Sequence, residues 1–307
     1  MDINVVGAGA MGCLFGARLT EGGHRVTLID VRADHVDAIR QHGLIVEENG
    51  KERVVRLEAT LPDGAREQTE LVVLFTKAFQ SEAALAGTRQ VIGPQTWVLS
   101  LQNGLGHVET IRKFVEARRI AVGTTTVPSD AAGLGRVRTR GSGNTKIMAV
   151  EGGISEPLRG IASALTQSGL PCEISERVWV NIWEKLAFNA AMNSLTAVTG
   201  LTVGQLGGTR EGPALANQVA EEVTSVAQRK GIAADHGATA REIAMAFREH
   251  GEHMPSMLQD VLAKRQTEIE SINGAIVREA ELLGVAVPCT SMLYRLVRLL
   301  EQTYRKA

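Results

Sequence analysis

The sequence lacks the features that mark secreted, membrane-spanning and nucleic-acid-binding proteins. It has only three cysteines, which lie far apart and predict neither a disulfide framework nor a metal site. It has no excess of one charge, because 33 basic and 34 acidic residues leave a net charge of −1, which attracts neither nucleic acid nor an anionic membrane. No apolar run approaches the length of a membrane span, and an apolar strand begins at residue 3, so we expect a cytoplasmic protein without a secretory signal.

A glycine motif near the start of the chain indicates a dinucleotide site. The apolar run at residues 3–6 leads into Gly7-Ala8-Gly9-Ala10-Met11-Gly12. The first glycine permits a tight turn, the second lets backbone N–H groups approach a pyrophosphate, and the third lets the next helix pack closely. A second apolar run ends at Asp30, near where an acidic residue contacts the adenosine ribose. The pattern predicts a Rossmann-type cofactor site.

The distribution of apolar residues divides the chain into two parts. Over residues 1–175, short apolar runs alternate with helical stretches, so we predict an α/β Rossmann-type N-terminal domain with a mainly parallel sheet. Over residues 176–307, strand signals largely vanish, and we predict an all-α C-terminal domain that carries the substrate and catalytic residues. In detail, we expect strands at 3–6, 24–29, 71–75, 96–101, 120–125 and 172–174, a hairpin at 135–139 and 145–150, and helices at 11–21, 155–168, 178–197, 211–230, 237–249, 256–284 and 289–305.

A polar stripe on the first helix of the second half is a candidate substrate site. Lys185, Asn189 and Asn193 follow one another at intervals of four, so they project from nearly the same helix face. The residues between them are apolar, and amides in such surroundings need hydrogen-bond partners. A bound polar substrate and an internal hydrogen-bond network both fit this pattern.

Other polar residues stand at the ends of predicted elements. Lys77 and Asn103 follow predicted strands at their carboxyl ends, where ligands bind in open α/β sheets, although an Asn-Gly turn or a solvated lysine would look the same. Ser256 suits the N-cap of a long helix. Glu268 lies 12 residues further along the same predicted helix, and we expect both side chains to address one cleft from one face of that helix.

Taken in order, these segments resemble the ketopantoate reductase (2-dehydropantoate 2-reductase) family over essentially the whole chain. The matching segments are the glycine motif of residues 7–12, Lys77, Leu101-Gln102-Asn103-Gly104, Lys185 with Asn189 and Asn193, Ser256 to Asp260, Thr267 to Glu270, and Asn273-Gly274. The resemblance implies reduction of the ketone of a 2-oxo acid by a nicotinamide cofactor, within pantothenate biosynthesis. It assigns Lys185 as the general acid and Glu268 as a catalytic carboxylate. Asn189, Asn193 and Ser256 are implied to bind substrate, and Asn103 to lie near both nicotinamide and substrate.

The cues for the cofactor conflict. The family commonly uses NADPH, which puts NADP ahead on resemblance, with Lys77 adding positive charge. Asp30 suits a free 2′-hydroxyl and repels a phosphate, which keeps NAD open, whereas Arg32 would attract the phosphate.

Three further questions stay open in the sequence. A related 2-oxo acid reductase or D-2-hydroxyacid dehydrogenase would retain the same catalytic set. A dinucleotide-sensing protein without catalysis would be expected to have lost it. A homodimer is possible, but the apolar helices that would support it could equally pack inside their own domain.

Overall fold

The computed structural model describes residues 1–304, and its contacts divide the chain into two units. One unit comprises residues 1–102 and 107–178. The other comprises residues 103–106 together with the described residues from Trp179 onward. The four-residue segment 103–106 therefore groups with the helical part, although it lies within the α/β part of the sequence.

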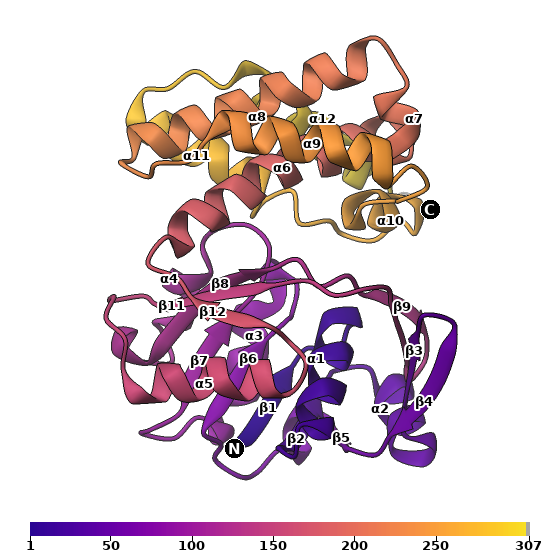
Figure 1. Ribbon diagram of the computed structural model, residues 1–307, viewed down its shortest axis with the longest axis vertical. Coiled ribbons are helices and arrows are strands. Elements are labelled where there is room, and N and C mark those ends of the chain that lie inside the picture. Colours follow the sequence, from indigo (N-terminus) through magenta and orange to yellow (C-terminus); the bar gives the residue numbers. More distant parts are fainter. Residues whose placement is uncertain (305–307) are drawn as a thin grey trace. The chain divides into compact units, whose positions relative to one another are not determined.

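The first unit is built on an eight-stranded sheet (Figure 1). Its spatial order is β12-β11-β8-β7-β6-β1-β2-β5. The strands are β1 Asp2–Val6, β2 Arg25–Ile29, β5 Glu58–Thr60, β6 Leu71–Leu74, β7 Trp97–Ser100, β8 Ile120–Thr125, β11 Thr145–Ala149 and β12 Cys172–Ile174. β11 pairs antiparallel with β8 and parallel with β12, so these two strands run opposite to the rest. The strands from β5 to β8 in this order pair in parallel, which confirms the predicted mainly parallel sheet. The central strands β6 and β7 are fully buried and largely apolar.

The helices of this unit join successive strands. They are α1 Ala10–Glu21, α2 Ala33–His42, α3 Ser81–Gly87, α4 His107–Ile111 and α5 Glu156–Gln167, with short 3₁₀ turns at Pro62–Gly64, Ala78–Gln80, Arg89–Val91 and Ala117–Arg119. The start of α5 shows how sequence sets a boundary, because the Ser155 side chain accepts a hydrogen bond from the Leu158 backbone N–H.

A second, four-stranded sheet corrects the predicted hairpin at 135–139 and 145–150. Its order is β4-β3-β10-β9, with β3 Leu44–Glu48, β4 Lys51–Val55, β9 Asp130–Gly133 and β10 Arg136–Thr139. β10 pairs with β3 and β9 in this sheet, whereas β11 pairs with β8 and β12 in the larger one. The hairpin was wrong because residues 141–144 connect two sheets and do not form a turn within one.

The second unit is helical, as predicted. Its helices are α6 Val178–Thr199, α7 Val203–Gly207, α8 Glu211–Arg229, α9 His236–Glu249, α10 Ser256–Leu262, α11 Asn273–Leu283 and α12 Pro288–Tyr304. The core gathers around Trp183, which is 1% exposed, and takes in the apolar stripe of α8, including Val219 and Val223. That stripe is used inside the unit and gives no argument for a homodimer. The carboxylate of Glu222 on α8 accepts hydrogen bonds from the Cys289 and Thr290 backbone N–H groups at 2.9 and 2.8 Å, which caps the start of α12.

The predicted helix over 256–284 was wrong in its middle. It ends at Leu262 and resumes as α11 at Asn273. Lys264 has a φ of 51°, outside the helical range. The backbone N–H of Thr267 donates to the carboxylate of Glu301 at 2.7 Å, so a side chain replaces the helical acceptor. Within residues 1–304, no helix is long and apolar enough to cross a membrane.

Candidate active site

The predicted cofactor motif lies where the strand order of the large sheet reverses. β1 is flanked by β2 on one side and by β6 on the other, and all three strands are parallel. Gly7, Asp30 and Lys77 come shortly after the carboxyl ends of these three strands. Crevices at such switch points are where open α/β sheets bind ligands.

The local geometry of the glycine motif fits a dinucleotide. A Cβ at Gly12 would lie 1.9 Å from the Gly7 carbonyl oxygen, and a Cβ at Gly7 would lie 2.7 Å from the Thr76 nitrogen, so the fold itself requires both glycines. A Cβ at Gly9 would meet no atom within 4 Å. Packing therefore does not explain Gly9, and the space beside it suits a pyrophosphate.

The start of α1 supports the same assignment. Its N-cap is Gly9, and no side chain caps the helix, so the first-turn N–H groups at Ala10 and Met11 are not bonded by a capping side chain. Exposed helix N–H groups with the positive end of the dipole are well suited to bind phosphate. These residues would hold the pyrophosphate of a nicotinamide dinucleotide.

Asp30 is fixed in place by backbone donors. Its carboxylate accepts hydrogen bonds from the Ala8 N–H at 2.8 Å and from the Arg32 N–H at 3.0 Å. The Arg32 guanidinium in turn donates to the carboxylate of Asp34 at 2.9 Å. The edge expected to meet the adenosine ribose thus presents two carboxylates and one arginine that is already paired.

Cys13 on α1 is a packing residue, as expected from sequence. Its side chain is 1% exposed, its thiol donates to the Ala8 carbonyl at 3.1 Å, and burial raises the pKa of the thiol to about 12. A thiol with such a pKa is not a nucleophile near neutral pH. Within the described residues, no group of three His, Cys, Asp or Glu side chains is placed to hold a metal ion.

Sequence reasoning gave no separate role to Gln102, which connects the ends of two strands. Its amide donates to the Thr76 carbonyl at 2.6 Å and to the Ser81 hydroxyl at 2.7 Å, while its carbonyl accepts from Ser100 at 2.9 Å. These bonds join the ends of β6 and β7 beside Lys77. The available signal was an amide side chain directly after a buried strand.

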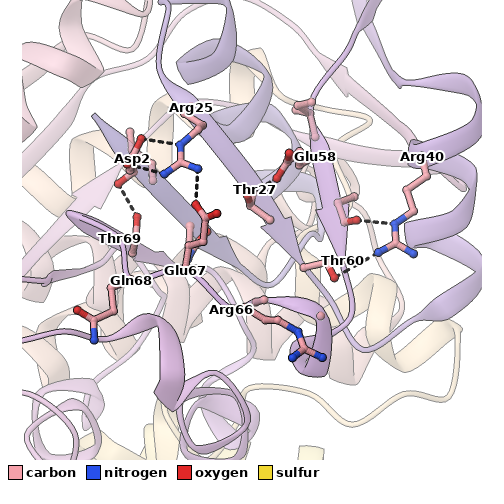
Figure 2. Close-up of a pocket in the computed structure, with 16 residues that line it drawn as sticks. Asp2, Arg25, Thr27, Arg40, Glu58, Thr60, Arg66, Glu67, Gln68 and Thr69 are labelled. Carbon is pink, nitrogen blue, oxygen red and sulfur yellow. Dashed lines mark hydrogen bonds and ion pairs between the residues drawn. The ribbon is translucent and has the colours of Figure 1, made fainter.

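The first unit also has a cavity of about 520 Å³ away from this edge (Figure 2). Asp2 and Arg25, the first residues of β1 and β2, lie on its wall, so it opens at the amino ends of the strands. Arg25 is paired with Asp2 and Glu67, and Arg40 donates to the Ala59 carbonyl at 2.7 Å. None of the predicted cofactor residues lines this cavity.

In the second unit, Lys185 has the chemistry of a proton donor. It lies half-buried on α6. Burial lowers its pKa from 10.5 to about 8, and the carboxylates of Glu268 and, more weakly, Glu242 oppose that shift. Glu268 itself is 7% exposed. The lysine and the carboxylate thus act on each other, although they come from segments far apart along the chain.

Two further predicted substrate residues, Asn189 and Asn193, lie on α6 with Lys185. The side chain of Asn193 is 4% exposed, that of Asn189 is half-buried, and neither amide bonds to another described residue. This favours a ligand over an internal network. Ser256 is exposed as the first residue of α10, where Pro255 is the N-cap, so the predicted N-cap role was wrong. Because the helix breaks after Leu262, Ser256 and Glu268 do not share a helix face.

Asn103 belongs to the helical unit together with Lys185 and Glu268. The backbone N–H of Leu105, two residues beyond it, donates to the Ser271 carbonyl at 2.9 Å. Ser271 lies three residues after Glu268. The loop after β7 is thereby attached to the turn that carries the candidate catalytic carboxylate.

Two models of one protein family match most of the chain. The model of the family ketopantoate reductase PanE/ApbA matches residues 3–152, and the model of its C-terminal domain matches residues 177–301. The chain belongs to the ketopantoate reductase family. Relatives in this family include the 2-dehydropantoate 2-reductase of Lactococcus lactis, 34% identical with 98% of each chain covered. Another is that of Halobacterium salinarum, 31% identical with 98% of this chain and 99% of the relative covered.

Solved structures of similar proteins share the family's fold. A D-mandelate dehydrogenase in a ternary structure with NADH and anilino(oxo)acetate is 35% identical, with a TM-score of 0.94 over 99% of this chain and 100% of that one. The PanE/ApbA family ketopantoate reductase of Ralstonia eutropha JMP134 is 32% identical, with a TM-score of 0.90 over the same shares. As a ketopantoate reductase family member, the chain is an oxidoreductase with a nicotinamide dinucleotide as cofactor and a small 2-oxo acid as substrate.

Proposed function

We propose that this enzyme reduces the keto group of ketopantoate to give pantoate, the step that places it in pantothenate biosynthesis. The family and its 2-dehydropantoate 2-reductase relatives support the reaction class. The observation that carries the proposal is Lys185, an ammonium with a pKa of about 8 beside the buried carboxylate of Glu268. A proton donor is most effective when its pKa lies near the working pH.

The proposed chemistry assigns the proton to Lys185. A bound nicotinamide supplies a hydride to the keto carbon. As the carbon–oxygen π bond opens, its electron pair becomes negative charge on oxygen, which the Lys185 ammonium stabilises and then protonates. The products are the 2-hydroxy acid and the oxidised cofactor, and the neutral lysine regains a proton from solvent. Glu268 favours the charged form of the lysine.

The substrate would be oriented by neutral groups. Asn189 and Asn193 present amides from α6, Ser256 presents a hydroxyl, and Asn103 approaches from the loop after β7. Neutral donors can hold a carboxylate and a hydroxyl without competing with the lysine for the developing charge.

The test is turnover with a panel of 2-oxo acids, followed through nicotinamide absorbance. Selective turnover of ketopantoate supports the proposal, and Lys185→Ala should lower kcat by about 100-fold to 10,000-fold while leaving cofactor binding intact. Turnover confined to phenylglyoxylate, the oxo acid of mandelate, would overturn the substrate and favour the D-2-hydroxyacid dehydrogenase alternative. Cofactor binding without turnover of any acid would instead indicate a dinucleotide-sensing protein.

We also propose that NADH is the preferred cofactor, which reverses the order that family resemblance suggested. Each carboxylate oxygen of Asp30 accepts a hydrogen bond from a backbone N–H group, which fixes the side chain in place. A 2′-phosphate would therefore approach a fixed negative charge. Two like charges about 4 Å apart repel by about 4 kcal/mol at an effective dielectric constant of 20. The opposing cue is weak, because Arg32 already pairs with Asp34. The structurally similar D-mandelate dehydrogenase was solved with NADH.

The experiment compares kcat/KM for NADH and NADPH in the wild type and in Asp30→Asn. We expect a preference of at least about tenfold for NADH in the wild type, and a large relative gain for NADPH in the variant, because the amide removes the charge but keeps an oxygen acceptor. Asp34→Asn is the matched control, since it frees Arg32 without touching Asp30. A wild-type preference for NADPH would refute the ordering.

A further inference from the structure

Within the helical unit, the segment 103–106 packs against Ser271 at a point that admits only glycine. Gly104 has a φ of +95°. A Cβ at this position would lie 2.4 Å from the Ser271 carbonyl oxygen, 2.8 Å from its carbonyl carbon and 2.9 Å from its Cβ. These are mostly backbone atoms, which cannot rotate out of the way. The same approach brings the Leu105 N–H to 2.9 Å from the Ser271 oxygen.

Ser271 is itself tied to Glu268. The Glu268 carbonyl accepts hydrogen bonds from the Ser271 N–H and hydroxyl, both at 3.1 Å, and from the Ile272 N–H at 3.0 Å. Glu268 and Ser271 are 7% and 8% exposed. Three bonds onto one carbonyl in a buried turn leave the Ser271 backbone little freedom relative to Glu268.

The turn is also attached to the helix that carries Lys185. The Asn273 side chain, fully buried, donates to the Ala190 carbonyl at 3.3 Å and lies 3.4 Å from the Ser194 hydroxyl. Ala190 stands between the two candidate substrate asparagines of α6. The 267–274 turn therefore connects the loop after β7 with α6.

We propose that Gly104 is a positioning residue: by docking on Ser271, it fixes Asn103 relative to Glu268 and Lys185. The proposal rests on the proposed function, since it assumes that Asn103 contacts the substrate or nicotinamide. Gly104 has no side chain to offer a ligand. Its contribution is the close approach, which places the neighbouring asparagine on the same rigid support as the proton donor.

Gly106 provides a matched control within the same loop. Its φ of +93° is nearly the same, but a Cβ there would meet no atom within 4 Å. Gly104→Ala and Gly106→Ala therefore place an alanine at nearly the same positive φ, and only the first disrupts the contact with Ser271. We expect Gly104→Ala to lower kcat by about tenfold or more relative to Gly106→Ala.

A double-mutant comparison separates positioning from general damage. If Gly104 acts through Asn103, the double variant Gly104→Ala, Asn103→Ala should have the same kcat as the single variant Asn103→Ala. Losses that multiply in the double variant would overturn the proposal, as would equal kcat values for the two alanine variants.

Hydrogen exchange distinguishes this proposal from the proposed function. The Leu105 amide should be protected in the wild type and in Gly106→Ala, and should exchange faster in Gly104→Ala, whether or not any substrate is turned over. If the Leu105 amide shows this exchange pattern but the wild type turns over no 2-oxo acid, the proposed function is refuted while the docking of Gly104 on Ser271 stands. An unprotected Leu105 amide in the wild type would overturn the docking itself.

Discussion

The pKa of Lys185 should set the upper limit of the pH range in which the enzyme reduces its substrate. An exposed lysine titrates near 10.5, whereas burial brings Lys185 to about 8. A general acid must be protonated, so kcat for reduction is at its plateau below this pKa and falls as the pH rises through it. With a pKa near 8, about one tenth of the enzyme is protonated at pH 9, so kcat should fall by about tenfold from its plateau.

The assay is kcat for reduction between pH 6 and 10 at saturating cofactor and substrate. The reverse reaction, oxidation of the 2-hydroxy acid, supplies an internal check. The neutral amine of Lys185 must accept a proton in that direction, so kcat for oxidation should rise as the pH passes through the same value. Lys185→Arg is the control: a guanidinium stays protonated throughout, so whatever activity remains should lose the fall near pH 8. A wild-type profile that is flat to pH 10 would refute the assignment of Lys185 as a buried general acid.

Four further predictions follow from contacts described above. Glu268→Gln should move the fall in reduction to lower pH, because it removes the carboxylate that raises the pKa of Lys185, and a pH profile of the residual activity measures this. Gly9→Ala should fold with an unchanged Tm yet bind NADH weakly in a fluorescence titration, because its Cβ enters only the space left for the pyrophosphate. Glu222→Ala should lower the free energy of unfolding in urea by about 1–2 kcal/mol through loss of the α12 cap, whereas its exposed neighbour Glu221→Ala should change it little. Trp183→Ala should cost about 3–5 kcal/mol in the same assay, and a smaller loss would mean that the core closes around the gap.

The main elements could be predicted because their signals are local. Buried parallel strands such as β6 and β7 read as unbroken apolar runs, and the long helices α6 and α8 show their period over many turns. The glycine motif and the spacing of Lys185, Asn189 and Asn193 are equally local, which is why they were recognised.

The misses depend on contacts between distant segments. The four-stranded sheet was not predicted. The Asn49-Gly50 turn between β3 and β4 is a recognisable hairpin signal, but β10 joins β3 from far along the chain, and no local pattern indicates that pairing. The break after Leu262 carries neither glycine nor proline, and one of its backbone N–H groups, that of Thr267, donates to the Glu301 side chain of α12. The contact between the loop after β7 and Ser271 could not be predicted, because neither segment carries a sequence pattern that indicates the other.

That attachment sets a rule for recombining members of this family. A chimera that joins the first half of one parent to the helical half of another keeps most of each unit together if the crossover is placed near Val178, where the two units divide. Residues 103–106 nevertheless pack with the helical unit, so in such a chimera they are encoded by the first parent while their packing partners come from the second. A working exchange of substrate specificity should therefore transplant this tetrapeptide together with the helices, as a second short insert far upstream of the main junction.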